Sequence, residues 1–210
     1  KRKLPTSYYG YESGCGLTLK QHMPDRPMRV GLIGLGVGTL TVYSRPGDYY
    51  RIYEINPAVI KMAAKHFTYL SEAAGELETV VADGRIALER EEPQRFDVLV
   101  LDAFSGDAIP THLLTKECGD LYMKHLKQDG ILAIHITNRH VDLQPVCNGL
   151  AKEFGLTAVS TISMKNTDMG TSYAHWVLLS RSAEAVEKLN FGQTTTSLLG
   201  ESSILWTDNF

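Results

Sequence analysis

Three acidic side chains and a glycine-rich turn follow apolar segments in the first half of the chain. The turn Gly34-Leu35-Gly36-Val37-Gly38 closes the segment 29–35, and glycine there permits a tight turn and lets a ligand approach the backbone. Glu54 ends the next apolar segment about twenty residues later, where a carboxylate can accept hydrogen bonds from both hydroxyls of a ribose. The alternatives are a tight turn without a ligand and an exposed carboxylate at a strand end.

Two further acids follow the next apolar segments. Asp83, followed by Gly84, stands where a carboxylate can accept from the amino group of adenine, and it can also cap a helix that begins there. Asp102 follows the unbroken apolar run 98–101, and a carboxylate beside a buried strand is costly without a cationic or hydrogen-bonding partner. We expect that partner to be a ligand amine, the alternative being a cap for the following loop.

Alternating strand and helix patterns supply these residues. Unbroken apolar runs such as 98–101 are typical of parallel strands that helices cover on both faces. The short connection 164–173 between the last two strand candidates predicts an antiparallel hairpin, because a helical crossover needs more residues. The expected fold is therefore α/β, a Rossmann-like three-layer sandwich with a mostly parallel seven-stranded sheet and a C-terminal antiparallel hairpin. The strand candidates are 29–35, 49–55, 77–82, 96–104, 130–137, 156–163 and 174–180, and the helix candidates are 57–67, 84–90, 111–126 and 143–154.

Composition narrows the class of protein. The 210 residues carry a formal net charge of -3 and are 43% hydrophobic, which argues against intrinsic disorder and gives no argument for a nucleic-acid partner or a membrane surface. Cys15, Cys118 and Cys147 are far apart, so we expect no disulfide framework and a reducing, cytoplasmic location. No apolar run reaches about 18 residues and no signal peptide is recognisable. Because the chain starts without methionine, we expect it to be a piece of a longer protein.

Together, the glycine turn, Glu54, Asp83 and Asp102 resemble the adenosyl-ligand site of spermidine synthases and related enzymes of the class I methyltransferase fold. The loop 102–110 resembles the gatekeeping loop of spermidine synthases. Further segments resemble spermidine synthase-like domains of bacteria, many of which are fused to a membrane region; these are 111–117, 136–139, 176–179 and 206–208. The resemblance implies an adenosyl-binding domain over 29–181, between a polar, irregular lead-in over 1–28 and a polar, irregular tail over 182–210.

The resemblance also implies a role for each residue of this site. The adenosine part of decarboxylated S-adenosylmethionine, or of S-adenosylmethionine itself, would be held by Gly34, Gly36, Gly38, Glu54, Asp83, Gly84 and Asp102. Asp102 matches the catalytic aspartate of the family and Asp107 its second, substrate-binding aspartate. Tyr9 or Tyr11 matches an upstream tyrosine, with Tyr9 the catalytic candidate and Tyr11 a substrate contact. The implied partner is a small-molecule amine and not a nucleic acid; a homodimer and a fusion to a membrane region outside these residues are open.

The function implied by the resemblance is aminopropyl transfer from decarboxylated S-adenosylmethionine to a polyamine acceptor. Carboxylates would attract the cationic amine and accept its proton before the nitrogen attacks. Val37 stands where spermidine synthases usually carry an aspartate, and their strand-rich front subdomain is not recognisable. Two alternatives therefore stay open. One is an S-adenosylmethionine-dependent methyltransferase, and the other is a non-catalytic regulatory domain that binds an adenosyl compound or a polyamine.

Other polar residues lie near the expected site. His135, Asn138 and His140 cluster at the end of the fifth strand candidate and are of types that can ligate a metal. No helical HxxxH pattern accompanies them, so we expect no metal and take Asn138 as a substrate contact. Arg85 could bind an acidic group and Asp208 could reach the site, but both are interpreted as surface residues.

Overall fold

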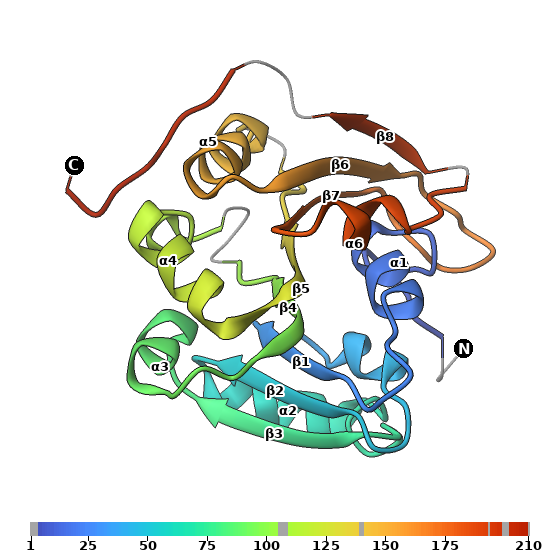
Figure 1. The fold of residues 1–210 in the computed structure, drawn as a ribbon. Helices are drawn as coiled ribbons and strands as arrows, with labels where there is room; N and C mark the ends of the chain where they lie inside the picture. The colour runs from blue at the N-terminus through green and yellow to red at the C-terminus, as the bar shows by residue number, and fades with distance from the viewer. Residues whose placement is uncertain (1–3, 105–108, 139–140, 193, 199–201, 210) are drawn as a thin grey trace.

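The structure is a computed structural model that describes residues 4–104, 109–138, 141–192, 194–198 and 202–209. Its strands are β1 (Arg29–Ile33), β2 (Tyr49–Glu54), β3 (Glu76–Val81), β4 (Phe96–Leu101), β5 (Leu126–His135), β6 (Thr157–Ser163), β7 (Ala174–Ser180) and β8 (Thr195–Leu198). They form one sheet in the order β3-β2-β1-β4-β5-β7-β6-β8 (Figure 1). Pairing is parallel from β3 to β5, and β7 runs antiparallel to both β5 and β6. The predicted fold with its C-terminal hairpin is confirmed, and β8 adds a short antiparallel strand beside β6.

Helices cover both faces of the sheet and produce the three layers. The helices are α1 (Gly14–Gln21), α2 (Pro57–His66), α3 (Gly84–Arg90), α4 (Lys116–His125), α5 (Gln144–Phe154) and α6 (Ala183–Glu187), with 3-10 helices η1 (Thr39–Tyr43) and η2 (Thr111–Leu113). α3, α4 and α5 pack on one face, whereas α1, α2 and α6 pack on the other (Figure 1). β4 is consequently buried along its whole length, as its unbroken apolar run predicts. Within the described ranges, no helix is long and apolar enough to cross a membrane.

The single helix predicted over 111–126 is in fact two elements, η2 and α4. Thr115 separates them because its hydroxyl oxygen accepts a hydrogen bond from the backbone N–H of Cys118 at 3.4 Å and caps α4. The buried Tyr122 of α4 donates its hydroxyl to the carbonyl of Leu113 at 2.9 Å. The short helix η2, which carries His112, is thereby anchored to α4.

The expectation that the two ends of the chain are irregular is wrong for the parts that the structure describes. In the lead-in, α1 begins after Ser13, whose side chain caps the helix. Gly14 lies so close to the sheet that a Cβ there would be 2.2 Å from the hydroxyl oxygen of Thr161. Such glycines permit close packing but hide the apolar spacing by which an amphipathic helix is recognised. In the tail, α6 packs on the sheet and β8 joins its edge.

The strand order reverses between β1 and β4, which is where an open α/β sheet usually binds its ligand. The backbone N–H of Gly34, directly after β1, donates to the carbonyl of Tyr53 in β2 at 2.8 Å. The backbone N–H of Asp102, directly after β4, donates to the carbonyl of Ile33 in β1 at 2.9 Å. These bonds hold the glycine turn and Asp102 against the same edge of the sheet.

Candidate active site

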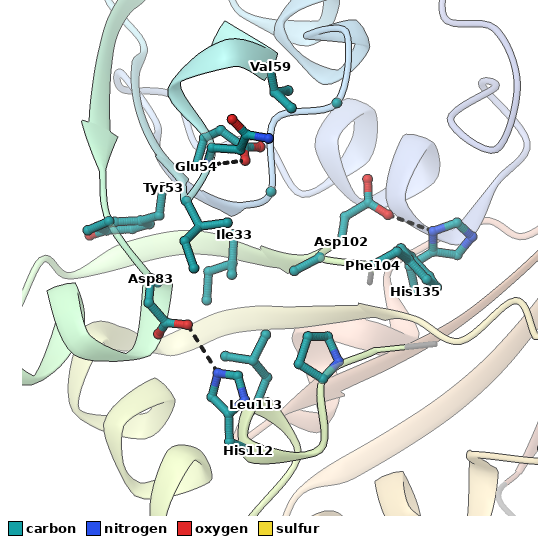
Figure 2. A pocket seen from close by; sticks show the side chains of 18 of the residues that line it. Ile33, Tyr53, Glu54, Val59, Asp83, Asp102, Phe104, His112, Leu113 and His135 are labelled. Atoms are coloured by element: carbon teal, nitrogen blue, oxygen red, sulfur yellow. Dashed lines mark hydrogen bonds and ion pairs between the residues drawn. The ribbon is translucent and has the colours of Figure 1, made fainter. Parts of the chain in front are cut away.

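A pocket of about 820 Å³ opens at this edge of the sheet (Figure 2). Its volume lies in the range of about 300–1,000 Å³ that is common for small-molecule sites. Most of the residues predicted from the sequence line it: Tyr9, Gly34, Gly36, Glu54, Asp83, Gly84, Asp102 and Asn138. The three acids come from the ends of β2, β3 and β4 and lie at separate places around the pocket.

The glycine-rich turn has backbone angles that favour glycine. Gly34, Gly36 and Gly38 have φ values of 99°, 54° and 85°. A Cβ at Gly34 would lie 2.3 Å from the carbonyl oxygen of Asp102, whereas a Cβ at Gly36 would meet no atom within 4 Å. Gly34 is therefore required by the packing of the turn, and Gly36 leaves open space at the pocket wall. Gly38 does not line the pocket and instead precedes η1; Val37 is exposed and does not line it either.

Glu54 is buried and oriented by the backbone. One carboxylate oxygen accepts from the N–H of Leu35 at 3.1 Å, and the other accepts from the N–H of Asn56 at 2.9 Å. These bonds connect the carboxylate to the glycine turn and to Asn56, which caps α2. A carboxylate has about four acceptor sites, so each oxygen can still accept from a ligand hydroxyl.

Asp83 caps α3, which confirms one of its two predicted roles. Its Oδ1 accepts from the backbone N–H groups of Arg85 and Ile86 at 2.9 and 3.1 Å. Its Oδ2 lies 3.1 Å from Nε2 of His112, a half-exposed side chain of η2 that also lines the pocket. Oδ2 of Asp83, which the helix cap does not use, therefore already lies beside a ring nitrogen of His112.

Asp102 is held between two side chains from other parts of the chain, of which Figure 2 shows His135. Its Oδ1 lies 2.6 Å from Nδ1 of His135, at the end of β5, and its Oδ2 accepts from the hydroxyl of Tyr9 at 2.7 Å. Burial, together with the Asp102 carboxylate, holds the pKa of Tyr9 well above its ordinary value. Tyr9 therefore keeps its proton and acts as a hydrogen-bond donor to Asp102.

Aromatic rings surround this pair. The imidazole of His135 is stacked on Trp176, with ring centroids 4.3 Å apart and planes at 8°. Phe104 contacts the same imidazole edge-on at 5.0 Å, and Tyr8 lies at 5.2 Å. Phe104 and Tyr8 are partly exposed and also line the pocket, so they give this side of it an apolar wall.

The remaining predicted contacts differ in their placement. Asn138 lines the pocket, and its side-chain oxygen accepts from the N–H of Val141 at 3.1 Å. Tyr11 lies outside this pocket; its ring packs edge-on against Tyr43 and lines a smaller cavity of about 190 Å³. Asp107 lies outside the described residues. Among the residues that the structure does describe, no group of three His, Cys, Asp or Glu side chains could hold a metal ion.

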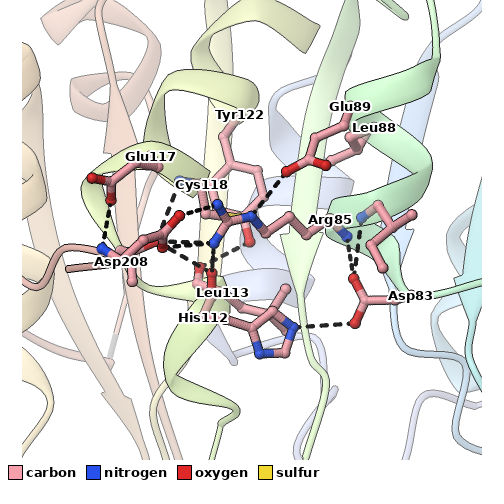
Figure 3. Close-up of polar contacts among 12 residues, drawn as sticks. Asp83, Arg85, Leu88, Glu89, His112, Leu113, Glu117, Cys118, Tyr122 and Asp208 are labelled. Atoms are coloured by element: carbon pink, nitrogen blue, oxygen red, sulfur yellow. Dashed lines mark hydrogen bonds and ion pairs between the residues drawn. The ribbon is translucent and has the colours of Figure 1, made fainter. Parts of the chain in front are cut away.

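Arg85 ties the C-terminal segment to the rim of the pocket (Figure 3). Its guanidinium donates to the Asp208 carboxylate and to the carbonyl of His112, each at 2.9 Å. Glu117 accepts from the backbone N–H of Asp208 at 3.0 Å. Hydrogen bonding to Arg85 lowers the pKa of Asp208 to about 2. The interpretation of Arg85 and Asp208 as surface residues therefore missed a contact that links the tail to η2.

Sequence reasoning did not predict that His135 contacts Asp102 or that His112 contacts Asp83. His135 was assigned only to a metal-capable cluster, yet a signal for its contact existed. The parallel register of β4 and β5 pairs Leu101 with Ile134. Asp102 and His135 are the next residues of the two strands, so they lie side by side. His112 offers no such signal, because its position depends on the separate folding of η2.

Comparisons with known proteins find similarity over part of the chain. No protein-family model matches the chain. It is 33% identical over 97 residues to a polyamine aminopropyltransferase from Vibrio vulnificus, and 32% identical over 109 residues to an N-terminal histidine N-methyltransferase from Emericella nidulans. The two matches cover 44% and 50% of this chain but only 32% and 19% of the relatives. The chain thus spans about a third and a fifth of the lengths of these proteins.

Several solved structures have the same fold. A probable spermidine synthase from Corynebacterium glutamicum has a TM-score of 0.65 at 18% identity, with 94% of this chain and 78% of that chain covered. A spermidine synthase in complex with the transition state analogue AdoDATO has a TM-score of 0.62 at 20% identity, covering 83% and 61%. Human methyltransferase-like protein 13 in complex with SAH has a TM-score of 0.64 at 18% identity, covering 83% and 85%. These structures share the methyltransferase fold with this chain, and the curated match to a polyamine aminopropyltransferase covers 44% of it.

Proposed function

We propose that the chain is an aminopropyltransferase-like domain that binds decarboxylated S-adenosylmethionine and transfers its aminopropyl group to a small amine. The observation that carries this proposal is the placement of Glu54, Asp83 and Asp102 around one pocket whose wall includes Gly34 and Gly36. The match to a polyamine aminopropyltransferase supports it, as does the spermidine synthase of the same fold in complex with AdoDATO.

The residues present fit an adenosyl group. Glu54 has an acceptor site left on each carboxylate oxygen, which suits the two hydroxyls of a ribose. Asp83 can accept from an adenine amino group through Oδ2, beside its contact with His112. Because a Cβ at Gly36 would meet no protein atom, the glycine at this position leaves the wall open for close approach of a ligand.

Asp102 serves the amine in this proposal. A cationic amine is attracted to the carboxylate, which takes one proton from it and holds the neutral nitrogen in place. Bound decarboxylated S-adenosylmethionine supplies the electrophilic carbon next to its sulfonium. The nitrogen lone pair forms the new N–C bond while the C–S bond breaks and its electron pair stays on sulfur. The rings of Phe104 and Tyr8 line the pocket beside Asp102 and can cover the methylene chain of the amine.

Methyl transfer from S-adenosylmethionine is the second candidate. It is favoured by the match to a histidine N-methyltransferase and by the shared fold of human methyltransferase-like protein 13, solved with SAH. The two co-substrates differ in one carboxylate, which only S-adenosylmethionine carries. A ligand carboxylate near Asp102 would be repelled, so the charge of this part of the pocket favours the decarboxylated compound.

Calorimetry with decarboxylated S-adenosylmethionine, S-adenosylmethionine and methylthioadenosine, followed by a putrescine transfer assay, tests the proposal. We expect tighter binding of the decarboxylated compound and formation of spermidine. Asp102→Asn should abolish transfer and leave methylthioadenosine affinity nearly unchanged, whereas Asp129→Asn, an exposed control early in β5, should change neither. Preference for S-adenosylmethionine with methylation of an acceptor would favour the second candidate. Binding without transfer would favour a regulatory domain, and no binding would contradict both enzyme candidates and a regulatory domain that binds an adenosyl compound.

A further inference from the structure

We propose that His135 is the positioning residue for Asp102, donating from Nδ1 to fix the carboxylate so that its remaining acceptor sites face the pocket. This inference rests on the proposed function, because it names how Asp102 is oriented toward the amine. His135 is not part of the adenosyl-ligand resemblance on which the other site residues were assigned. It lines the pocket but is only 3% exposed, so most of its surface contacts protein.

The hydrogen-bond partners of the imidazole fit a neutral ring that carries its proton on Nδ1. An ionised Asp102 can only accept, so Nδ1, at 2.6 Å from Oδ1, must carry a proton. Nε2 lies 2.7 Å from the hydroxyl oxygen of Thr137. That oxygen already accepts from the backbone N–H of His175 at 2.8 Å, so its own hydrogen is available for Nε2. With a neutral imidazole protonated at Nδ1, the Asp102 carboxylate, both ring nitrogens and the Thr137 hydroxyl each have a hydrogen-bond partner.

The rings around His135 prevent the imidazole from turning away. Its face is stacked on Trp176, and Trp176 itself donates from Nε1 to the carbonyl of Tyr8 at 3.2 Å. Phe104 closes the edge of the imidazole at 5.0 Å. An immobilised imidazole holds Asp102 more firmly than a solvent-exposed donor would, because its rotamer is fixed by packing.

These contacts leave Asp102 with acceptor sites that no donor among the described residues uses. Two of its about four acceptor sites are taken, one by His135 and one by Tyr9. Both donors line the pocket together with Asp102, and the acceptor sites that they leave unused are the ones through which an amine can approach. The orientation of the carboxylate, and with it the position of the attacking nitrogen, depends on both donors.

Two variants of His135 separate the positioning role from a packing role, because each keeps a nitrogen at the place of only one of the two ring nitrogens. In His135→Asn, the amide nitrogen can occupy the position of Nδ1 and donate to Asp102. In His135→Gln, the amide reaches the position of Nε2, keeps a partner in Thr137 and loses the donor to Asp102. Both variants lose the imidazole stacked on Trp176, so a role confined to packing would affect them equally.

We expect His135→Gln to lower kcat for putrescine by about 100-fold and His135→Asn by less than about 10-fold, since misplacing a reacting group by about 1 Å costs up to about 100-fold. Methylthioadenosine affinity should be the same in both variants and in the unmodified chain. Equal losses of kcat in the two variants, or an unchanged kcat in His135→Gln, would overturn the inference.

A second measurement does not depend on activity. Long-range ¹H–¹⁵N correlation spectra of the full chain should show His135 protonated at Nδ1 and unprotonated at Nε2. A proton on Nε2 with Nδ1 bare would overturn the positioning role. If the chain binds methylthioadenosine but transfers to no amine, the proposed function fails, and the spectrum alone then decides the role of His135.

Discussion

Gly34→Ala and Gly36→Ala form a matched pair that separates the structural from the ligand-binding role of the glycine turn. Both positions have positive φ values, 99° and 54°, so alanine is strained at each. For an L-residue this strain is worth about 1–2 kcal/mol. The gain from a less flexible unfolded chain is the same for both substitutions and cancels in the comparison.

The two positions differ in what the new methyl group meets. At Gly34 it lies 2.3 Å from the carbonyl oxygen and 2.9 Å from the carbonyl carbon of Asp102, so the backbone after β4 must move. Overpacking of this kind costs about 1–3 kcal/mol, which brings the expected loss for Gly34→Ala to about 3 kcal/mol. At Gly36 no atom lies within 4 Å, so only the strain of about 1 kcal/mol remains.

Urea unfolding and calorimetry measure the two effects separately. Gly34→Ala should lower the free energy of unfolding by about 2 kcal/mol more than Gly36→Ala does. Gly36→Ala should stay folded and bind methylthioadenosine at least about 10-fold more weakly, because its methyl group occupies the pocket wall. Equal stabilities would refute the packing argument for Gly34. Undiminished binding by Gly36→Ala would refute the assignment of this wall to the ligand.

Three further predictions concern charges and thiols away from the reaction. Burial alone would raise the pKa of Asp97, but hydrogen bonds from arginine, lysine and backbone donors outweigh it and hold the pKa below its ordinary value. Asp97→Asn should therefore lower the free energy of unfolding by about 3 kcal/mol at pH 7. Urea titrations should show this difference shrinking as the pH falls from about 4, where the carboxylate of the unfolded chain takes up its proton, through the lower pKa of the folded state. Asp208→Asn removes the carboxylate paired with Arg85 and should speed limited proteolysis of the segment 202–209, read by mass spectrometry, without changing the melting midpoint of the sheet. Burial raises the pKa values of Cys118 and Cys147 to about 12, and Cys15 is raised too, so a thiol reagent at pH 8 should label the chain only after unfolding.

The sheet could be predicted because its central strands are buried on both faces. β4 is apolar at five of its six positions, so its identity does not depend on recognising an alternating pattern. The hairpin followed from the short connection between β6 and β7. α1 could not be predicted in this way, because Gly14 and Gly16 allow it to pack closely without an amphipathic sequence.

The acids of the site could be predicted for a related reason. Glu54 ends a strand, and Asp83 and Asp102 follow strands whose carboxyl ends meet at one edge, so sequence position is enough to bring them together. The contacts that complete the site are of another kind. Asp83 and His112 are 29 positions apart, and Arg85 and Asp208 are 123 positions apart. Both depend on the paths of loops, which no local pattern specifies.

The side of the pocket around Asp102 is therefore built by segments that the sheet alone does not bring together. Tyr9 comes from the lead-in, and it is fixed there because its own carbonyl accepts from the hydroxyl of Tyr43 at 2.6 Å. His135 comes from β5 and is fixed by register and by the stack on Trp176. Since burial keeps the proton on Tyr9, Asp102 is met by a permanent donor on one oxygen and by the imidazole on the other. The orientation of Asp102 therefore depends on the lead-in through Tyr9 and on β5 through His135.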